Sequence, residues 1–203
     1  RNGMTISRDS KLGNSTKVTY FSMGKDTSIS QESYDRMTMY IGASGWGEFI
    51  IGEEPEIIKL QPDELLIVPA GTLCGMQTSN GIVYTEIICT GKDINMNANV
   101  KTNEVFALKN LISLRRSSIA NMDVVSTPDM KYVLMAFDEG TGLTPHRAPG
   151  NAIVFALEGK ATIGYEGKDY ELSEGECFRF EKNGLHSVTA NGKFKMALLL
   201  VLE

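Results

Sequence analysis

Short runs of apolar and β-branched residues, separated by turn residues, dominate the pattern along this chain. Three of these runs cover residues 17–22, 82–89 and 132–137, and each has the length of a single β-strand. Strands of this length that recur between turn signals are typical of a sandwich or a barrel. The pattern therefore predicts an all-β protein.

Three further segments predict individual elements. Residues 162–172 contain two β-type runs around Glu166-Gly167, and a two-residue loop ending in glycine favours a tight hairpin because glycine tolerates positive φ. Residues 196–202 are apolar at every position, which predicts a strand covered on both faces. Residues 103–112 carry apolar residues near helical spacing, which predicts a short helix, with an edge strand or plain linker as the alternative.

The two halves of the chain repeat each other. Residues 63–74 match residues 175–186 position for position, and residues 43–51 match residues 157–165. A duplication detected at two independent points is a strong signal of repeated domains. The expected organisation is an N-terminal domain over residues 1–95, a linker over 96–130 and a C-terminal domain over 131–203.

Composition and charge narrow the classes of function. The chain has 203 residues, 42% hydrophobic and 22% charged, which is ordinary for a soluble globular protein. A net charge of −5 argues against binding to nucleic acid or an anionic membrane, since phosphate neutralisation needs clustered Lys and Arg. No apolar run approaches the roughly 20 residues that span a bilayer. We therefore expect neither a nucleic-acid nor a membrane partner.

The cysteines and the N-terminus bear on location. The three cysteines, Cys74, Cys89 and Cys177, are an odd number without paired spacing. They predict no disulfide framework, and a reducing cytoplasm is the expected compartment. No signal-peptide pattern is visible, and the sequence begins with Arg1 rather than Met. The completeness of the N-terminus is therefore open.

The only two histidines, His146 and His186, lie within two spaced motifs. The first motif places Gly140 six residues before His146 and ends at Gly159, and the second runs from Gly175 to His186. These motifs resemble the two motifs of the cupin family, and the resemblance covers most of residues 17–90 and 113–202. It implies a bicupin, in which two tandem jelly-roll barrels, or double-stranded β-helices, are joined by a linker.

The family's metal ligands are only partly present. The resemblance assigns His146 to the first histidine of the first motif and His186 to the histidine of the second. Ala148 and Ala152 occupy the positions of the family's second histidine and glutamate. In the N-terminal copy, the corresponding four positions are held by Glu32, Tyr34, Thr38 and Cys74.

This incomplete ligand set leaves the cofactor open. Three imidazoles and a carboxylate suit Fe, Mn, Ni or Zn, whereas two imidazoles hold a divalent ion poorly because a catalytic metal normally has about three protein ligands. A third ligand would have to come from elsewhere, such as Cys177. We favour a metal-free polar pocket over a metal at the two histidines. The ligand-binding candidates are His146, His186, Tyr165, Cys177, Arg179, Glu32, Tyr34 and Cys74, although Cys74 fits a small buried hydrophobe better.

Three functions follow from this reading, in order of preference. The first is a protein that binds a small polar or anionic molecule in the C-terminal barrel, whose mouth forms a concave site. The second is a metal-dependent enzyme of the isomerase or dioxygenase type that uses His146 and His186. The third is a structural or assembly role. We also expect a homodimer, because jelly-roll barrels expose sheet edges and apolar outer faces.

Overall fold

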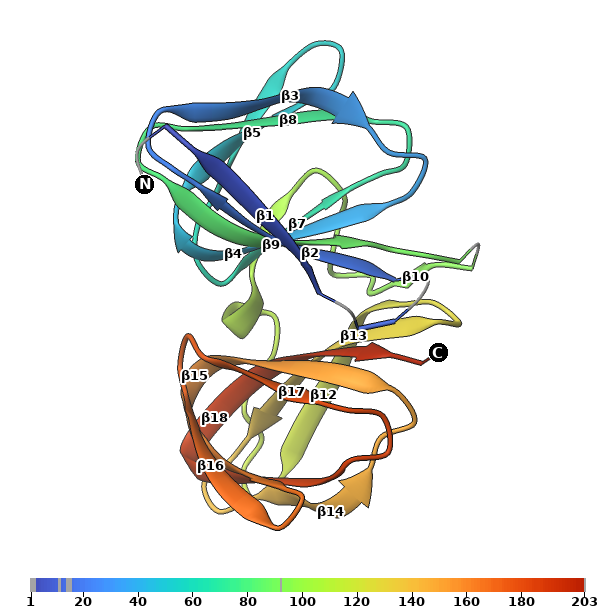
Figure 1. Cartoon of the computed structure of the whole chain (residues 1–203). Helices are drawn as coiled ribbons and strands as arrows, with labels where there is room; N and C mark the ends of the chain where they lie inside the picture. The colour runs from blue at the N-terminus through green and yellow to red at the C-terminus, as the bar shows by residue number, and fades with distance from the viewer. Residues whose placement is uncertain (1–2, 11, 14–15, 92, 203) are drawn as a thin grey trace. The chain divides into compact units, whose positions relative to one another are not determined.

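The computed structural model describes residues 3–10, 12–13, 16–91 and 93–202. The chain divides into two compact units (Figure 1). The N-terminal unit comprises Arg1–Thr90 and Ala98–Ala107, and the C-terminal unit comprises Gly91–Asn97 and Leu108–Glu203. The expected outer ends of the two domains, residues 1 and 203, lie outside the described residues.

The fold is all-β, as predicted. Across the described ranges, the chain forms eighteen strands and a single 3-10 helix, η1 (Leu108–Asn110). No helix in that part of the chain has the length and apolar character needed to cross a membrane.

The N-terminal unit consists of two antiparallel sheets. One has six strands in the order β1-β2-β9-β4-β7-β11, and the other has four in the order β3-β8-β5-β6. Figure 1 shows them as two layers, with β3, β5 and β8 across from β4, β7 and β9. The strands are β1 (Thr5–Ser10), β2 (Lys17–Met23), β3 (Thr27–Ser33), β4 (Thr38–Gly45), β5 (Gly47–Ile51), β6 (Glu56–Leu60), β7 (Glu64–Val68), β8 (Leu73–Thr78), β9 (Ile82–Ile88) and β11 (Val105–Ala107).

The space between these two sheets holds the core of the N-terminal unit. Phe49 and Met76 come from the four-stranded sheet, and Tyr40 and Tyr84 come from the six-stranded sheet. All four side chains are at most 4% exposed. Because side chains alternate between the faces of a strand, one face of each sheet supplies these residues. This inner face also builds the cavity described below.

The C-terminal unit forms one sheet path in the order β10-β12-β13-β18-β15-β16, with β14 paired to β18 and β17 paired to β15. Its two longest strands, β15 and β18, pair along most of their lengths, with register shifts at Ala156/Glu158 and Gly159/Ala161. The strands are β10 (Asn95–Met96), β12 (Ile119–Ser126), β13 (Met130–Phe137), β14 (Gly142–Arg147), β15 (Asn151–Tyr165), β16 (Lys168–Ser173), β17 (Cys177–Phe180) and β18 (Leu185–Val201).

Two local predictions are confirmed. Tyr165 pairs with Lys168 across a two-residue loop, and both loop residues have positive φ, 47° at Glu166 and 80° at Gly167, as a type I′ hairpin requires. Residues 196–201 form the end of β18, where alternate side chains are almost fully buried and the strand pairs with both β13 and β15.

The prediction of a helix over residues 103–112 is wrong. Val105–Ala107 forms β11, which pairs with β7 through Leu66, Leu65 and Glu64. Only the single turn η1 follows, and it buries Leu108. Backbone pairing to a sheet edge outweighs the weak helical spacing, because tertiary contacts override local propensity in short segments.

Candidate ligand-binding site

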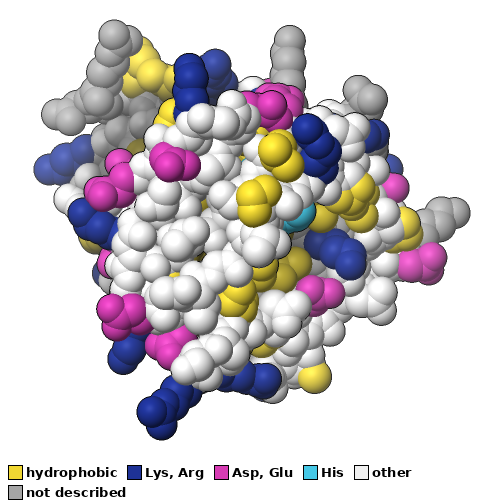
Figure 2. Space-filling model, turned by 90° about the horizontal axis from the view of Figure 1, so that it is seen from below, with side chains coloured by type: hydrophobic (Ala, Val, Ile, Leu, Met, Phe, Trp, Pro, Cys, Tyr) yellow, Lys and Arg dark blue, Asp and Glu magenta, His cyan; other side chains and the backbone are white. Residues whose placement is uncertain are grey.

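The two histidines lie on neighbouring strands of the C-terminal unit. His146 on β14 pairs in register with His186 on β18, and the centroids of the two rings are 4.3 Å apart. His186 is 7% exposed, whereas His146 is exposed. Figure 2 shows histidine surface flanked by apolar and basic side chains on this face of the molecule.

Backbone carbonyls define how each imidazole can act. Nδ1 of His146 lies 2.8 Å from the Thr144 carbonyl oxygen, and Nδ1 of His186 lies 3.0 Å from that of Gly184. Since a carbonyl oxygen only accepts, each Nδ1 carries the hydrogen and each neutral ring keeps its Nε2 lone pair. Burial lowers the pKa of His186, and the nearby His146 lowers it further, against the raising effect of the Gly184 hydrogen bond.

Aromatic side chains surround His186. Its ring stacks on Phe180 with centroids 4.2 Å apart and an angle of 23°. Tyr165, which pairs with His186 across β15 and β18, packs against Phe178 and Phe180. The Tyr165 hydroxyl oxygen accepts a hydrogen bond from the Glu181 amide at 3.3 Å. The structure thus brings Tyr165 together with the histidines.

Cys177 and Arg179 lie on the other face of β17. Phe178 and Phe180 on this strand join the aromatic cluster, so the alternation of side chains along a strand turns Cys177 and Arg179 away from it. Both residues are exposed, and Arg179 Nε forms an ion pair with Glu181 at 3.0 Å. The structure therefore does not bring these two residues together with the histidines.

The donor set at the histidines does not fit the metal centre that the cupin motifs imply. Ala152 faces the core of the C-terminal unit at 1% exposure and supplies no donor atom. In the parts of the chain that the structure describes, no group of three or more His, Cys, Asp or Glu side chains could hold a metal ion. Two imidazoles alone fall short of the roughly three protein ligands of a catalytic metal.

The N-terminal unit repeats the same local geometry with different side chains. Glu32 on β3 pairs in register with Cys74 on β8, and the register shifts between Ile29 and Glu32. In the C-terminal unit, the register shifts at the equivalent place, between Leu143 and His146. The structure thus places Glu32 and Cys74 as it places the two histidines.

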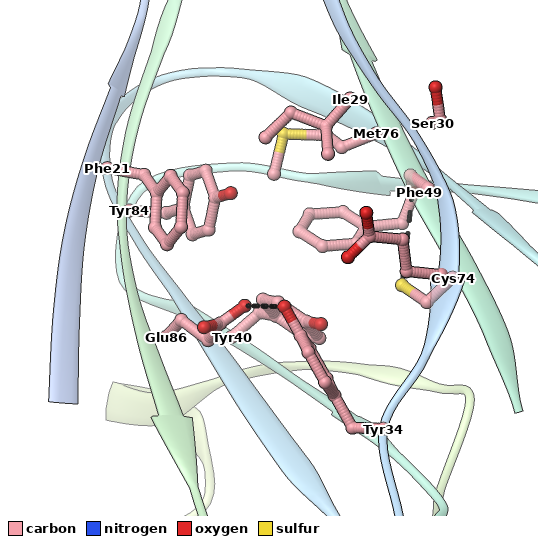
Figure 3. A pocket seen from close by; sticks show the side chains of 12 residues that line it. Phe21, Ile29, Ser30, Tyr34, Tyr40, Phe49, Cys74, Met76, Tyr84 and Glu86 are labelled. Carbon is pink, nitrogen blue, oxygen red and sulfur yellow. Dashed lines mark hydrogen bonds between the residues drawn. The ribbon is translucent and has the colours of Figure 1, made fainter. Parts of the chain in front are cut away.

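A cavity of about 190 Å³ lies next to this pair, inside the N-terminal unit. Figure 3 shows Ile29 and Met76 at one end, Glu86 and Tyr34 at the other, and aromatic rings between them. Glu32 is exposed, so it lies at the rim. The cavity is lined by Phe21, Ile29, Ser30, Glu32, Tyr34, Tyr40, Phe49, Cys74, Gly75, Met76, Tyr84 and Glu86.

Glu86 is the buried ionisable group of this cavity. It sits in the middle of β9 at 5% exposure, and the Tyr34 hydroxyl donates a hydrogen bond to its Oε2 at 3.5 Å (Figure 3). Burial raises the pKa of Glu86 to about 6, partly opposed by Lys17 and the Tyr34 hydrogen bond. The carboxyl group therefore changes charge near neutral pH.

The phenol and thiol groups of the cavity are neutral at pH 7. Burial and Glu86 raise the pKa of Tyr34 to about 12, and both also raise those of Tyr40 and Tyr84. Burial raises the pKa of the Cys74 thiol to about 11. Cys74 is therefore a thiol rather than a thiolate, which removes it as a nucleophile.

Sequence reasoning missed Glu86, Tyr40 and Tyr84. Residues 82–89 were correctly predicted as a strand, and Glu86 is the lone carboxylate within that apolar run. Tyr84 and Glu86 are two residues apart, which puts both on one face of the strand. A charged residue in phase with the inner face was the available signal, and only the packing of Tyr84 in the core of the N-terminal unit shows which face is inner.

Comparisons with known proteins show what the chain is similar to. Residues 133–202 match the model of the cupin domain. A search of curated proteins finds no match to the chain.

Solved structures resemble the whole chain. A cupin 2 conserved barrel domain protein from Leptotrichia buccalis is 24% identical with a TM-score of 0.87, over 99% of this chain and 90% of that one. A salicylate 1,2-dioxygenase from Pseudaminobacter salicylatoxidans is 10% identical with a TM-score of 0.67, over 92% and 71%. Identities this low establish the fold alone.

Proposed function

Since residues 133–202 match the model of the cupin domain, we propose that this chain is a cupin-domain protein that binds a small organic molecule in the cavity of its N-terminal unit, without a catalytic metal. One observation carries the proposal. A buried carboxyl group, Glu86, faces a cavity of about 190 Å³ whose other lining residues are mainly aromatic and apolar. Concave apolar sites with a few convergent polar groups and a perturbed pKa are the usual form of a ligand site.

The N-terminal unit is, in this proposal, a second cupin barrel that has exchanged metal ligands for a binding cavity. The matching register of Glu32–Cys74 and His146–His186 supports the duplication. In this bicupin organisation, the N-terminal barrel would bind the small molecule. The C-terminal barrel would keep a reduced set of metal ligands.

Side-chain polarity favours the N-terminal unit over the C-terminal barrel expected from the sequence. Positions equivalent to Tyr40 and Tyr84 carry Val154 and Met196 in the C-terminal repeat. Val154 is 0% and Met196 1% exposed within one apolar core cluster. The equivalent of Glu86 is Leu198, which also packs against that cluster. The C-terminal repeat thus has apolar side chains where the N-terminal repeat has polar ones.

A metal-dependent enzyme at His146 and His186 is the second candidate. The 4.3 Å separation of the two rings favours it, because both Nε2 atoms could meet one ligand. The absence of a third donor among the described residues counts against it. The resemblance to a dioxygenase concerns the fold, which hosts many unrelated chemistries.

Thermal-shift screening of the full chain tests the proposal. A library of cationic, neutral and anionic small molecules should contain compounds that raise the melting temperature, since a ligand that binds only the folded state stabilises it. Tyr34→Phe and Glu86→Gln should reduce these shifts, and His146→Ala should leave them unchanged. Two outcomes would contradict the proposal. One is that the compounds lose their effect in His146→Ala but keep it in the two cavity variants, and the other is that no compound raises the melting temperature.

A further inference from the structure

We infer that the cavity of the N-terminal unit selects a small organic ammonium ion over neutral and anionic molecules of the same shape. This inference rests on the proposed function and names the class of ligand. It departs from the polar or anionic ligand expected from the sequence. Three features of the described lining residues carry it: the aromatic walls, the sign of the charge and the long hydrogen bond at Glu86.

Five of the twelve residues that line the cavity are aromatic. Phe21 and Tyr84 stack with centroids 4.9 Å apart, and Phe49 lies edge-on to Tyr84 at 77° with centroids 6.0 Å apart. Tyr40 is tilted by 54° to both Phe49 and Tyr84. Rings set at such different angles present both faces and edges to one space. A cation within about 6 Å of a ring face is attracted by its quadrupole.

The ionisable groups that line the cavity are acidic, and no Lys or Arg is among the lining residues. Glu86 is buried, whereas Glu32 is exposed. An anion would enter a site lined by two carboxyl groups, with Lys17 near Glu86 but outside the lining residues, at a cost that burial increases. A cation meets the opposite balance, because a carboxylate and ring faces both attract it.

Glu86 has capacity for a stronger partner than Tyr34. The 3.5 Å distance from the Tyr34 hydroxyl to Oε2 exceeds the usual O–H···O range of about 2.5–3.0 Å, so this bond is weak. A bound ammonium group would supply a charge-assisted contact instead. It would also lower the pKa of Glu86, so the ligand and a proton would compete at this carboxyl group.

The cavity volume limits the size of the ligand. An apolar cavity of about 150 Å³ holds one benzene molecule, and this cavity is about 190 Å³. Choline and benzylamine are cationic probes of this size class. Each has an uncharged isostere: carbon replaces the quaternary nitrogen of choline, and a hydroxyl group replaces the amine of benzylamine. Comparing the two members of a pair separates the effect of charge from that of shape.

Isothermal titration calorimetry of the full chain at pH 7.5 tests the inference. At least one of the two cations should bind about tenfold more tightly than its isostere, a ratio that corresponds to about 1.4 kcal/mol. Glu86→Gln should reduce the ratio, because only the ring faces would still favour the cation, whereas Glu54→Gln, on an exposed turn of the same unit, should leave it unchanged.

The pH dependence provides a second readout. Affinity for the cation should fall as the pH falls from 7 to 5, because protonation removes the charge of Glu86. The groups that face Glu86 are Lys17, Asp9, Glu32, Tyr34, Tyr40, Cys74 and Tyr84. Glu86→Gln should remove most of the dependence.

The outcomes separate this inference from the proposed function. Equal binding of a cation and its isostere, or tighter binding of an anion, would overturn the choice of ligand class. Neither result would contradict the proposal that the cavity binds a small molecule. Failure of both cations, when neutral compounds from the thermal-shift screen bind, would also overturn only the choice of ligand class. Failure of every compound in that screen would overturn both proposals.

Discussion

At the scale of single residues, Glu86 makes the stability of the fold depend on pH. Its pKa of about 6 in the folded chain exceeds the ordinary value of 4.5 because the group is buried. Between these two values the folded chain keeps a proton that the unfolded chain releases. The free energy of unfolding therefore decreases as the pH rises through this window, by about 2 kcal/mol.

Glu86→Gln should remove that decrease. The measurement is urea unfolding at pH 4.5 and pH 7, where the variant should lose about 2 kcal/mol less than the parent chain between the two values. Glu54→Gln is the control and should behave as the parent chain does. If the free energy of unfolding fell as much in Glu86→Gln as in the parent chain between pH 4.5 and pH 7, ionisation of Glu86 would not be the cause of the decrease.

His186 should act in the opposite direction. Burial lowers its pKa in the folded chain below 6.5, so below pH 6.5 the unfolded chain takes up a proton that the folded chain resists. The free energy of unfolding therefore falls as the solution is acidified from neutral pH. His186→Phe, which preserves a ring to stack on Phe180, should reduce this loss between pH 7.5 and 5.5 in urea unfolding. The same loss in parent and variant would contradict the prediction.

At the scale of elements, each repeat has a glycine at the same position. In each unit, this glycine permits another segment of that unit to approach the strand closely. Gly45 and Gly159 occupy equivalent positions and have φ of 67° and 76°. A Cβ atom at Gly45 would overlap the Gly81 carbonyl oxygen, and one at Gly159 would overlap that of Lys193. The repeated glycine thus combines a left-handed backbone with a close approach of another strand.

Replacing these glycines tests the cost of that approach. Gly159→Ala should destabilise the chain by about 3 kcal/mol or more, since both the backbone conformation and the steric overlap oppose it. Gly140→Ala is the control, because φ there is 72° with no atom within 4 Å of the added Cβ, and it should cost about 1 kcal/mol. Chemical denaturation measures both. Equal losses would mean that the backbone conformation alone matters.

At the scale of the whole molecule, an edge of the six-stranded sheet supports the expected homodimer. β1 forms this edge, and its Ile6 is 50% exposed, in one row across the sheet with Ser22 and the 37% exposed Val83. Edge strands and exposed apolar side chains are commonly covered by association. We propose that a second copy of the chain covers this edge.

Light scattering after size exclusion tests the dimer. The parent chain should have the mass of two 22.3 kDa chains. Ile6→Lys should have the mass of one, because a lysine on an edge strand opposes pairing with another edge. A single-chain mass for the parent across a wide concentration range would contradict the proposal.

The sequence by itself determined the all-β class, the repeat and the meeting of His146 with His186. The first two follow from local properties, namely strand-length apolar runs, turn glycines such as Gly167 and the internal match of residues 63–74 with residues 175–186. The meeting of the histidines is what the resemblance of their two motifs to the cupin motifs implies. Such features survive in the folded chain because backbone pairing and the two-residue period of a strand carry them directly into three dimensions.

Only the tertiary structure decided which residues enclose a site. Within residues 103–112, Val105–Ala107 pairs with a sheet edge instead of forming a helix, because a partner strand distant in sequence satisfies its backbone. Arg179 and Cys177 leave the histidine cluster because Phe178 and Phe180 take the inner face of β17. Glu86, Tyr40 and Tyr84 meet in one cavity because the two sheets of the N-terminal unit pack face to face. Local pattern does not contain these choices, since they depend on which faces are buried together and how side-chain volumes fill the space between them.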